Sequence, residues 1–302
     1  MQGELILVAD FSSWSVAHQA RFEDVLHKLL PSAEVTPQHL HHAMRYAVLD
    51  GGKRVRPLLV FAAGELVGAD PSRLNIAAAA VEMIHAYSLV HDDMPCMDDD
   101  VLRRGKPTCH VQYGEATALL VGDSLQTLAF QLIAENNLSN DATRQLAMIK
   151  TLAIASGSRG MAGGQAMDLV NVGKALSLQE LEMMHIHKTG ALIRAAVLLG
   201  AQCGEFTEAQ LANLDHFAKC MGLAFQVVDD VLDSEADTAT LGKTAGKDAN
   251  NSKPTYVSLL GVQDARVMAK TLHDEALASL VEFGQGARRL RELADFIVLR
   301  KF

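Results

Sequence analysis

The chain has 302 residues, of which 49% are hydrophobic, and its formal net charge is −9. A negative charge of this size argues against a nucleic-acid partner. No apolar run reaches the roughly 18 residues that a membrane span needs, and no basic segment precedes the apolar N-terminal stretch, so we expect neither a membrane span nor a secretory signal. The 4 cysteines form no C-x-x-C pair, which predicts neither a zinc site nor a redox motif and is typical of reduced thiols in the cytoplasm.

Glycine and proline residues mark the breaks between a series of predicted helices. Residues 1–15 show no useful pattern, and we expect them to be loosely attached. The expected helices cover residues 16–30, 37–49, 53–67, 73–93, 114–136, 140–172, 177–202, 207–234, 254–261, 263–283 and 287–300. Strand alternation, fixed-period repeats and Pro- or Ser-rich linkers are not found. We therefore predict an all-α fold in one domain over residues 1–302.

The first chemical signal is a run of five carboxylates within nine positions, residues 92–100. Asp92 and Asp93 end a predicted helix, because Pro95 blocks its continuation. The C-terminus of a helix is an unfavourable place for negative charge, and clustered carboxylates repel one another. The run therefore predicts a bound cation, and oxygen-only ligands suit Mg²⁺.

A second carboxylate cluster lies far downstream at Asp229, Asp230 and Asp233. Asp229 and Asp233 are four residues apart and project from one helical face. Valines and a leucine flank them, so this face is not a solvated acidic surface. One Asp-rich run alone is more typical of a surface loop, but two runs embedded in apolar helices favour a shared site.

A cationic segment, Gly51-Gly52-Lys53-Arg54-Val55-Arg56, precedes both clusters. Lys53 and Arg56 stand at a helix start behind two permissive glycines, where N–H groups and positive charge suit a phosphate. The spacing is not that of a Walker loop, and a basic surface turn is an equally good interpretation of this segment alone. His85 lies seven residues before Asp92, two turns back on nearly the same face.

The motifs Asp92-Asp93-x-x-x-x-Asp98 and Asp229-Asp230-x-x-Asp233 resemble the two Asp-rich motifs of the trans-prenyltransferase (polyprenyl synthetase) family. The two extra residues before Asp98 make the first motif most similar to that of its bacterial farnesyl diphosphate synthases. The resemblance extends from about Gly51 to the C-terminus. It implies an isoprenoid-synthase-type helical bundle around a central cavity, and a homodimer. It also implies Mg²⁺-dependent head-to-tail condensation of isopentenyl diphosphate with dimethylallyl and geranyl diphosphates to farnesyl diphosphate, by ionisation, condensation and proton loss.

The resemblance also assigns roles to individual residues. It implies that Asp92, Asp98 and Asp229 coordinate three Mg²⁺, with Asp93, Asp230 and Asp233 as ligands or supports. It places isopentenyl diphosphate on Lys53, Arg56, His85 and Arg104, and the allylic diphosphate on Arg103, Gln165, Lys188 and Lys243. Lys188, Thr189 and Gln226 are implied to act in catalysis by stabilising a nearby cation. The polar loop 237–254 is expected to close over the allylic diphosphate.

Product length is expected to depend on Tyr87 and Ser88, which lie five and four residues before Asp92. They fall roughly 6 to 8 Å below the metals along the helix. Ser88 shares a face with Asp92, but Tyr87 is about 140° away on an ideal wheel. The resemblance, rather than the wheel, therefore implies that Tyr87 is the floor of the pocket.

Three other functions compete with this interpretation. The first is a synthase of another product length, geranyl or geranylgeranyl. The second is a class I terpene cyclase or a head-to-head synthase, against which the Lys53, Arg56 and His85 group argues, because a cyclase has no second diphosphate to hold. The third is an inactive regulatory subunit, which intact motifs at both ends of the chain do not favour.

Overall fold

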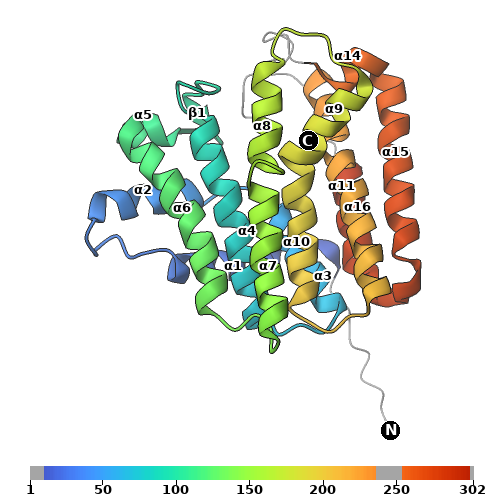
Figure 1. Cartoon of the computed structure of the whole chain (residues 1–302), viewed down its shortest axis with the longest axis horizontal. Helices are drawn as coiled ribbons and strands as arrows, with labels where there is room; N and C mark the ends of the chain where they lie inside the picture. The colour runs from blue at the N-terminus through green and yellow to red at the C-terminus, as the bar shows by residue number, and fades with distance from the viewer. Residues whose placement is uncertain (1–9, 236–253, 300–302) are drawn as a thin grey trace.

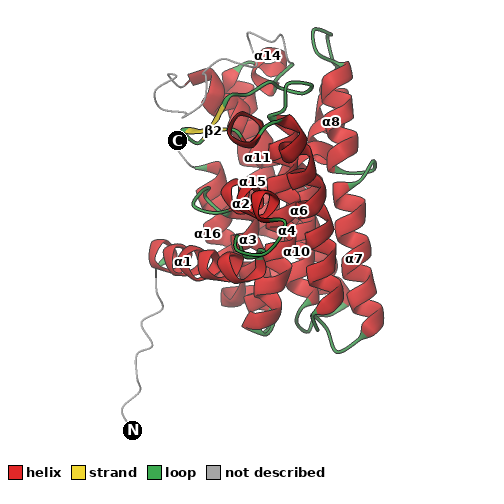
Figure 2. Cartoon of the chain, turned by 90° about the vertical axis from the view of Figure 1, so that its left-hand side faces the viewer, coloured by secondary structure: helices red, strands yellow, loops and turns green. Residues whose placement is uncertain are grey.

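The structure is a computed structural model that describes residues 10–235 and 254–299, and these residues are almost entirely helical (Figures 1 and 2). The predicted all-α fold is confirmed. The α-helices are α1 (Phe11–Leu29), α2 (Gln38–Val48), α3 (Val55–Leu66), α4 (Pro71–Asp92), α5 (Cys109–Tyr113), α6 (Glu115–Glu135), α7 (Ala142–Ser156), α8 (Met161–Val170), α9 (Leu178–His185), α10 (Ala191–Gln202), α11 (Glu208–Glu235), α14 (Tyr256–Leu260), α15 (Val262–Ser279) and α16 (Arg288–Val298). A π-helix, η1 (Ile186–Gly190), joins α9 to α10, and a 3₁₀ helix, η2 (Val281–Ala287), precedes α16.

One small hairpin interrupts the helices directly after the first carboxylate run. Strands β1 (Leu102–Arg103) and β2 (Lys106–Pro107) pair antiparallel, with Arg103 opposite Lys106. Arg104 and Gly105 form the two-residue turn, and both have positive φ, 52° and 76°. Positive φ at both positions is the geometry of a type I′ turn. The sequence did not reveal this hairpin because its strands are too short to alternate.

Helix α4 lies in the middle of the bundle and packs against α3, α6 and α10. Ala77, Ala78, Ala79 and Ala80 are fully buried. These small side chains allow neighbouring helices to approach closely, while larger residues fill the space between them. The main cluster of buried side chains includes residues from Trp14 to Ile297. A single domain would require such a continuous core. The one-domain organisation stays a prediction.

The expectation of a loosely attached N-terminus is wrong for residues 10–15. Helix α1 begins at Phe11, because the Asp10 carboxylate accepts a hydrogen bond from the Ser13 backbone N–H (2.7 Å) and caps the helix. Trp14 is buried and its Nε1–H donates to Glu65 (3.1 Å). Residues 1–9 lie outside the described residues.

The single helix expected over residues 140–172 is also wrong. Helix α7 ends at Ser156 and α8 begins at Met161. A Cβ on Gly160 would lie 2.2 Å from the carbonyl oxygen of Ala155, so the break depends on glycine. After this break, α8 brings Gln165 to the wall of the cavity described below.

Within the described residues, α6 is the one helix that could cross a membrane by length and composition, and 44% of its most apolar window is buried. It packs along α4. A long, apolar helix in the body of a bundle passes the same test, so the predicted absence of a membrane span stays a prediction.

The ends of two helices define one end of the molecule. Figure 1 shows that α4 ends beside β1 and that α11 ends beside α14, both at the top of the view. The two carboxylate clusters stand at these helix ends. Helix η1 packs against both α8 and α11 close by, and single π-helical turns of this kind occur frequently at functional sites.

Candidate active site

A cavity of about 360 Å³ lies beside the C-terminal end of α4. Four elements, α3, α4, α8 and η1, contribute predicted site residues to its wall. These residues are Arg56, His85, Tyr87, Ser88, Asp92, Gln165, Lys188 and Thr189. The structure thus brings eight of the predicted residues together from segments more than 130 positions apart in the sequence.

Asp92 and Asp93 have different surroundings although they are neighbours in sequence. Asp92 is half-buried on the cavity wall, and burial raises its pKa to about 6, with Lys188 opposing this rise and Asp98 adding to it. Asp93 is buried and accepts hydrogen bonds from Arg103, at 2.9 and 2.8 Å from Nε and 2.6 Å from Nη2. Asp92 is therefore available to a ligand, whereas Asp93 fixes Arg103.

The loop after α4 folds Asp98 back towards the helix end. The Asp98 backbone N–H donates to the carbonyl oxygen of Asp92 (2.9 Å). Asp99 has a positive φ of 52°, a conformation that aspartate tolerates better than most residues. The turn places two half-buried carboxylates, Asp92 and Asp98, at one helix terminus.

The second carboxylate cluster also contains a buried aspartate with a structural role. Asp230 is buried and accepts hydrogen bonds from Gln226 Nε2 (3.1 Å) and from the backbone N–H of Tyr256 (2.8 Å), the first residue of α14. It thereby satisfies a free N–H at a helix N-terminus. Asp229 and Asp233 are half-buried, one turn apart on α11.

Lys188 and Thr189 are fixed on different partners. Lys188 Nζ donates to Asp168 Oδ2 (2.5 Å), and Thr189 Oγ1 donates to Gln226 Oε1 (3.1 Å). Since Gln226 also donates to Asp230, hydrogen bonds connect η1 to the second carboxylate cluster. Hydroxyl and amide oxygens held in this way can stabilise a positive charge nearby.

Glycines allow η1 to lie this close to its neighbours. A Cβ on Gly164 would lie 2.1 Å from the backbone nitrogen of Lys188, and one on Gly222 would lie 2.8 Å from the Cα of Gly190. Gly222 is one turn before Gln226 on α11. The contact between these two glycines therefore sets how closely Thr189 approaches Gln226.

Arg56 and His85 form the cationic part of the cavity. Arg56 Nη1 lies 3.4 Å from His85 Nε2, and within residues 10–235 and 254–299 the buried Nε of Arg56 has no hydrogen-bond partner. Burial lowers the pKa of His85 well below its usual value, and the nearby Arg56 lowers it further. A neutral His85 can accept from Arg56, while the unpartnered Nε–H leaves one donor for an anion.

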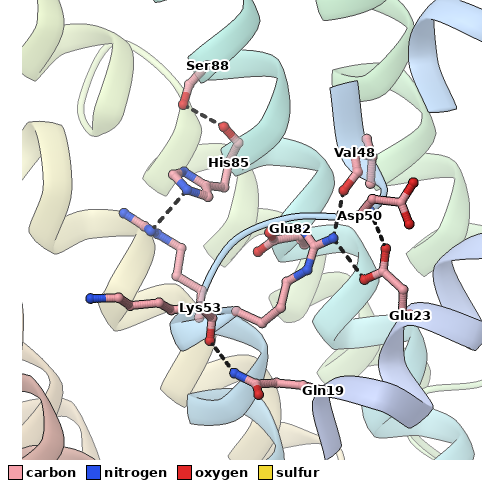
Figure 3. A network of polar contacts seen from close by, with 10 residues as sticks. Gln19, Glu23, Val48, Asp50, Lys53, Glu82, His85 and Ser88 are labelled. Carbon is pink, nitrogen blue, oxygen red and sulfur yellow. Dashed lines mark hydrogen bonds and ion pairs between the residues drawn. The ribbon is translucent and has the colours of Figure 1, made fainter. Parts of the chain in front are cut away.

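Arg54, which the sequence analysis did not select, anchors this segment. Figure 3 labels its three partners, Glu23, Val48 and Glu82. Arg54 is buried and donates to Glu82 (2.6 Å), to Glu23 (2.9 Å) and to the carbonyl oxygen of Val48 (2.7 Å). Its neighbour Lys53 is exposed, and the Lys53 carbonyl accepts from Gln19 Nε2 (2.8 Å). Nothing in the sequence around Lys53, Arg54 and Arg56 indicated that Arg54 has a structural role.

Arg104 lies against the glycine pair predicted for phosphate binding. A Cβ on Gly52 would lie 2.8 Å from Arg104 Nη2, and Gly52 has a φ of 89° that suits glycine. The glycine pair therefore leaves room for the Arg104 guanidinium, in addition to preceding α3. The structure also lines the cavity with His91 of α4 and with Met161 and Leu169 of α8, which the sequence analysis missed; the two α8 residues depend on the helix break before Met161.

The described carboxylates suit a hard divalent cation. Asp92, Asp98, Asp229 and Asp233 offer oxygen ligands only, and all four are half-buried. The pKa of Asp92 is raised, as expected for a carboxylate near other negative charges and away from water, and a cation would relieve that repulsion. Lys243 and the predicted closing loop, apart from Pro254, lie outside the described residues.

Comparisons with known proteins agree with this geometry. The family model described as polyprenyl synthetase matches residues 37–282. The chain is 52% identical over 262 residues to farnesyl diphosphate synthase of Escherichia coli strain K12, covering 85% of this chain and 88% of the relative. It is 48% identical over 266 residues to a chloroplastic geranylgeranyl pyrophosphate synthase of Capsicum annuum, covering 87% and 72%. The apo crystal structure of an FPP/GFPP synthase from Zymomonas mobilis superposes with a TM-score of 0.86 at 40% identity, covering 95% of this chain and 98% of that one.

Proposed function

Because this chain belongs to the polyprenyl synthetase family and is a prenyltransferase, we propose that it condenses isopentenyl diphosphate with dimethylallyl and then geranyl diphosphate to give farnesyl diphosphate. The observation that carries the proposal is the cavity that joins Asp92, the Arg56 and His85 pair, and Lys188 with Thr189. A condensation of two diphosphates needs a metal site, an independent anion pocket and a place for the reacting carbons. This cavity wall offers all three.

Membership of the family implies a divalent-metal-dependent enzyme. We propose Mg²⁺, three ions per active site, held by Asp92, Asp98 and Asp229 with support from Asp233. When bound, the ions neutralise the allylic diphosphate and make it a better leaving group. Asp93 and Asp230 support the site through Arg103 and through the start of α14.

The chain's own residues then position the reactants. Arg56, His85, Lys53 and Arg104 hold the diphosphate that does not ionise, with the free Nε–H of Arg56 as a donor. Lys188 and Arg103, with Gln165, face the allylic diphosphate, while Thr189 and Gln226 direct oxygen dipoles at the allylic cation. The double bond of isopentenyl diphosphate attacks that cation, and the proton is lost to the released diphosphate, so no side-chain base is required.

Product length is the finer part of the proposal. Both Tyr87 and Ser88 line the cavity, although the ideal wheel separates Tyr87 from Asp92. The Tyr87 ring lies 5.8 Å from that of His91, which lines the same cavity. A tyrosine ring below the aspartates supports a fifteen-carbon product. Geranylgeranyl diphosphate is the second candidate, since a relative of that name is 48% identical.

We further propose a homodimer in the cytoplasm. Leu119 and Leu120 on α6, Leu146 on α7 and Val170 on α8 are exposed to between 48% and 66%. Exposed apolar residues on three successive helices support an interface between subunits on this side of the bundle. The four free cysteines agree with a reducing compartment.

A product assay tests the proposal. Purified protein would be incubated with isopentenyl and dimethylallyl diphosphates, with Mg²⁺ or with EDTA, and the alcohols measured after phosphatase treatment. Farnesol that requires Mg²⁺ is the expected result. A twenty-carbon alcohol would retain the mechanism and move the assignment to the second candidate. Cyclic hydrocarbon from farnesyl diphosphate, or no turnover by folded protein, would overturn the proposal in favour of a cyclase or a regulatory subunit.

A further inference from the structure

A cluster of three potential metal ligands lies away from the active site, between α11 and α15. It consists of His216 and Cys220 on α11 and Glu275 on α15, and the ligand atoms all lie within 4.8 Å of one another. The two helices pack along each other, as Figure 1 shows at the right of the view. Cys220 stands 9 residues before Asp229 on the same helix, which places the cluster about 14 Å or more along the axis from the carboxylate site.

From this geometry we infer that His216, Cys220 and Glu275 form a binding site for a divalent transition metal of the Zn²⁺ class. Cys220 Sγ lies 3.7 Å from His216 Nε2 and 3.9 Å from Glu275 Oε2. Around a tetrahedral Zn²⁺ with ordinary bond lengths, sulfur and its nitrogen or oxygen neighbours are separated by about 3.5 Å. Shifts of a few tenths of an ångström would complete the site.

The chemistry of the three ligands selects this class of metal. Imidazole, thiolate and carboxylate together suit Zn²⁺ or Co²⁺, whereas Mg²⁺ prefers oxygen ligands alone. His216 and Cys220 are four residues apart, so they project from one face of α11. The fourth position is open to water because His216 and Glu275 are exposed, while Cys220 lies beneath them at 5% exposure.

The three side chains are also available. In the described part of the chain, the contacts of His216 and Glu275 are those with Cys220. The other group of comparable spacing, Glu23, His27 and Asp50, is not available in the same way, because the Glu23 carboxylate is bound to Arg54. Burial and the nearby Glu275 raise the pKa of Cys220 to about 11, so metal binding would displace the thiol proton.

The two metal sites would be separate, because about 14 Å of α11 lies between Cys220 and Asp229. A metal at His216, Cys220 and Glu275 would join α11, which carries Asp229, to α15, and so hold together two helices that pack side by side. The pairing of ligands 55 positions apart explains why cysteine spacing in the sequence gave no sign of the site. The inference rests on these contacts and not on the proposed function.

Cobalt titration of the full chain tests the inference, with saturating Mg²⁺ present to occupy the carboxylate site. Co²⁺ bound to a thiolate gives a ligand-to-metal charge-transfer absorption, which carboxylates do not give. We expect one equivalent of Co²⁺ to produce this absorption and Zn²⁺ to displace it. Asp229→Asn should bind as well as the unmodified chain, and so should Cys203→Ser, which removes a buried thiol elsewhere.

The ligand variants supply the decisive comparison. Cys220→Ser should abolish the absorption, and His216→Asn, an exposed change that should not disturb folding, should weaken Co²⁺ binding at least about tenfold. Zn²⁺ should raise the melting temperature of the unmodified chain but not that of His216→Asn. Absence of the absorption, or an affinity unchanged in both variants, would mean an adventitious ion only and would overturn the inference.

Discussion

Arg103 holds Asp93 through three N–H···O contacts of 2.6 to 2.9 Å, while Asp92, the residue before it, faces the cavity. The two adjacent aspartates therefore have different structural roles. Asp93 belongs to the framework, and Asp92 is available to a ligand. In the second cluster, Asp230 belongs to the framework in the same way, because it holds the start of α14.

The first prediction separates these two roles by stability in EDTA. Asp93→Asn should lower the free energy of unfolding by about 1–3 kcal/mol, since it weakens charge-assisted hydrogen bonds to a partly exposed arginine. Asp92→Asn should leave stability unchanged or raise it: burial disfavours the charged form of both aspartates, but only Asp93 has the hydrogen bonds to Arg103 that the change would weaken. Urea unfolding of both variants gives the comparison. An equal loss in Asp92→Asn would contradict the division.

The second prediction concerns the contact between Gly222 and Gly190. Gly222→Ala places a Cβ 2.8 Å from the Cα of Gly190, so it should push η1 away from α11 and reduce kcat at least about tenfold. Gly190→Ala is the matched control. Its Cβ meets its nearest atom, the His185 carbonyl oxygen, at 3.6 Å, an ordinary contact. Steady-state kinetics that show equal losses in the two variants would refute the argument.

The third prediction tests the floor of the cavity. Tyr87→Ala should shift the product from fifteen carbons to twenty or more, because it removes the aromatic ring from the cavity wall. Tyr87→Phe keeps the ring and should keep the product. Chromatography of the dephosphorylated alcohols measures both. Farnesol as the sole product of Tyr87→Ala would show that another residue limits the chain.

The fourth prediction is a dependence of stability on pH that arises at His185. This side chain is buried, neither ring nitrogen has a hydrogen-bond partner among the described residues, and burial lowers its pKa to about 4, with Lys188 adding to the effect. The unfolded chain therefore binds a proton more readily than the folded one. The neutral His185 side chain therefore contributes to the free energy of unfolding. This contribution is fully present above about pH 6.5, and roughly 3 kcal/mol of it is lost as the pH falls towards 4.

His185→Phe should flatten this acid dependence, because phenylalanine cannot bind the proton. The exposed His42 provides the control, and His42→Gln should retain the slope of the unmodified chain. Unfolding free energies measured from pH 7 to pH 5 give the comparison. A slope unchanged in His185→Phe would show that the acid dependence arises elsewhere.

Helical periodicity and turn residues predicted the helical fold, because both are local properties, and the family resemblance pointed to eight residues of the cavity wall. The sequence did not reveal the break between α7 and α8, which depends on a clash that Gly160 avoids. It also could not separate Asp93 from Asp92, or Arg54 from Arg56. Those distinctions depend on partners such as Glu82, which only the packing of helices brings near.

The hairpin between β1 and β2 bears on how the binding of one ligand affects the binding of another. Its type I′ turn directs Arg103 towards Asp93 and Arg104 towards Gly52, and both arginines line one small pocket beside α4. If the two proposed diphosphates bind these arginines, a movement of one arginine reaches the other through a single peptide bond. Such linkage is reciprocal. Whatever factor the first substrate then contributes to the affinity of the second, the second returns to the first.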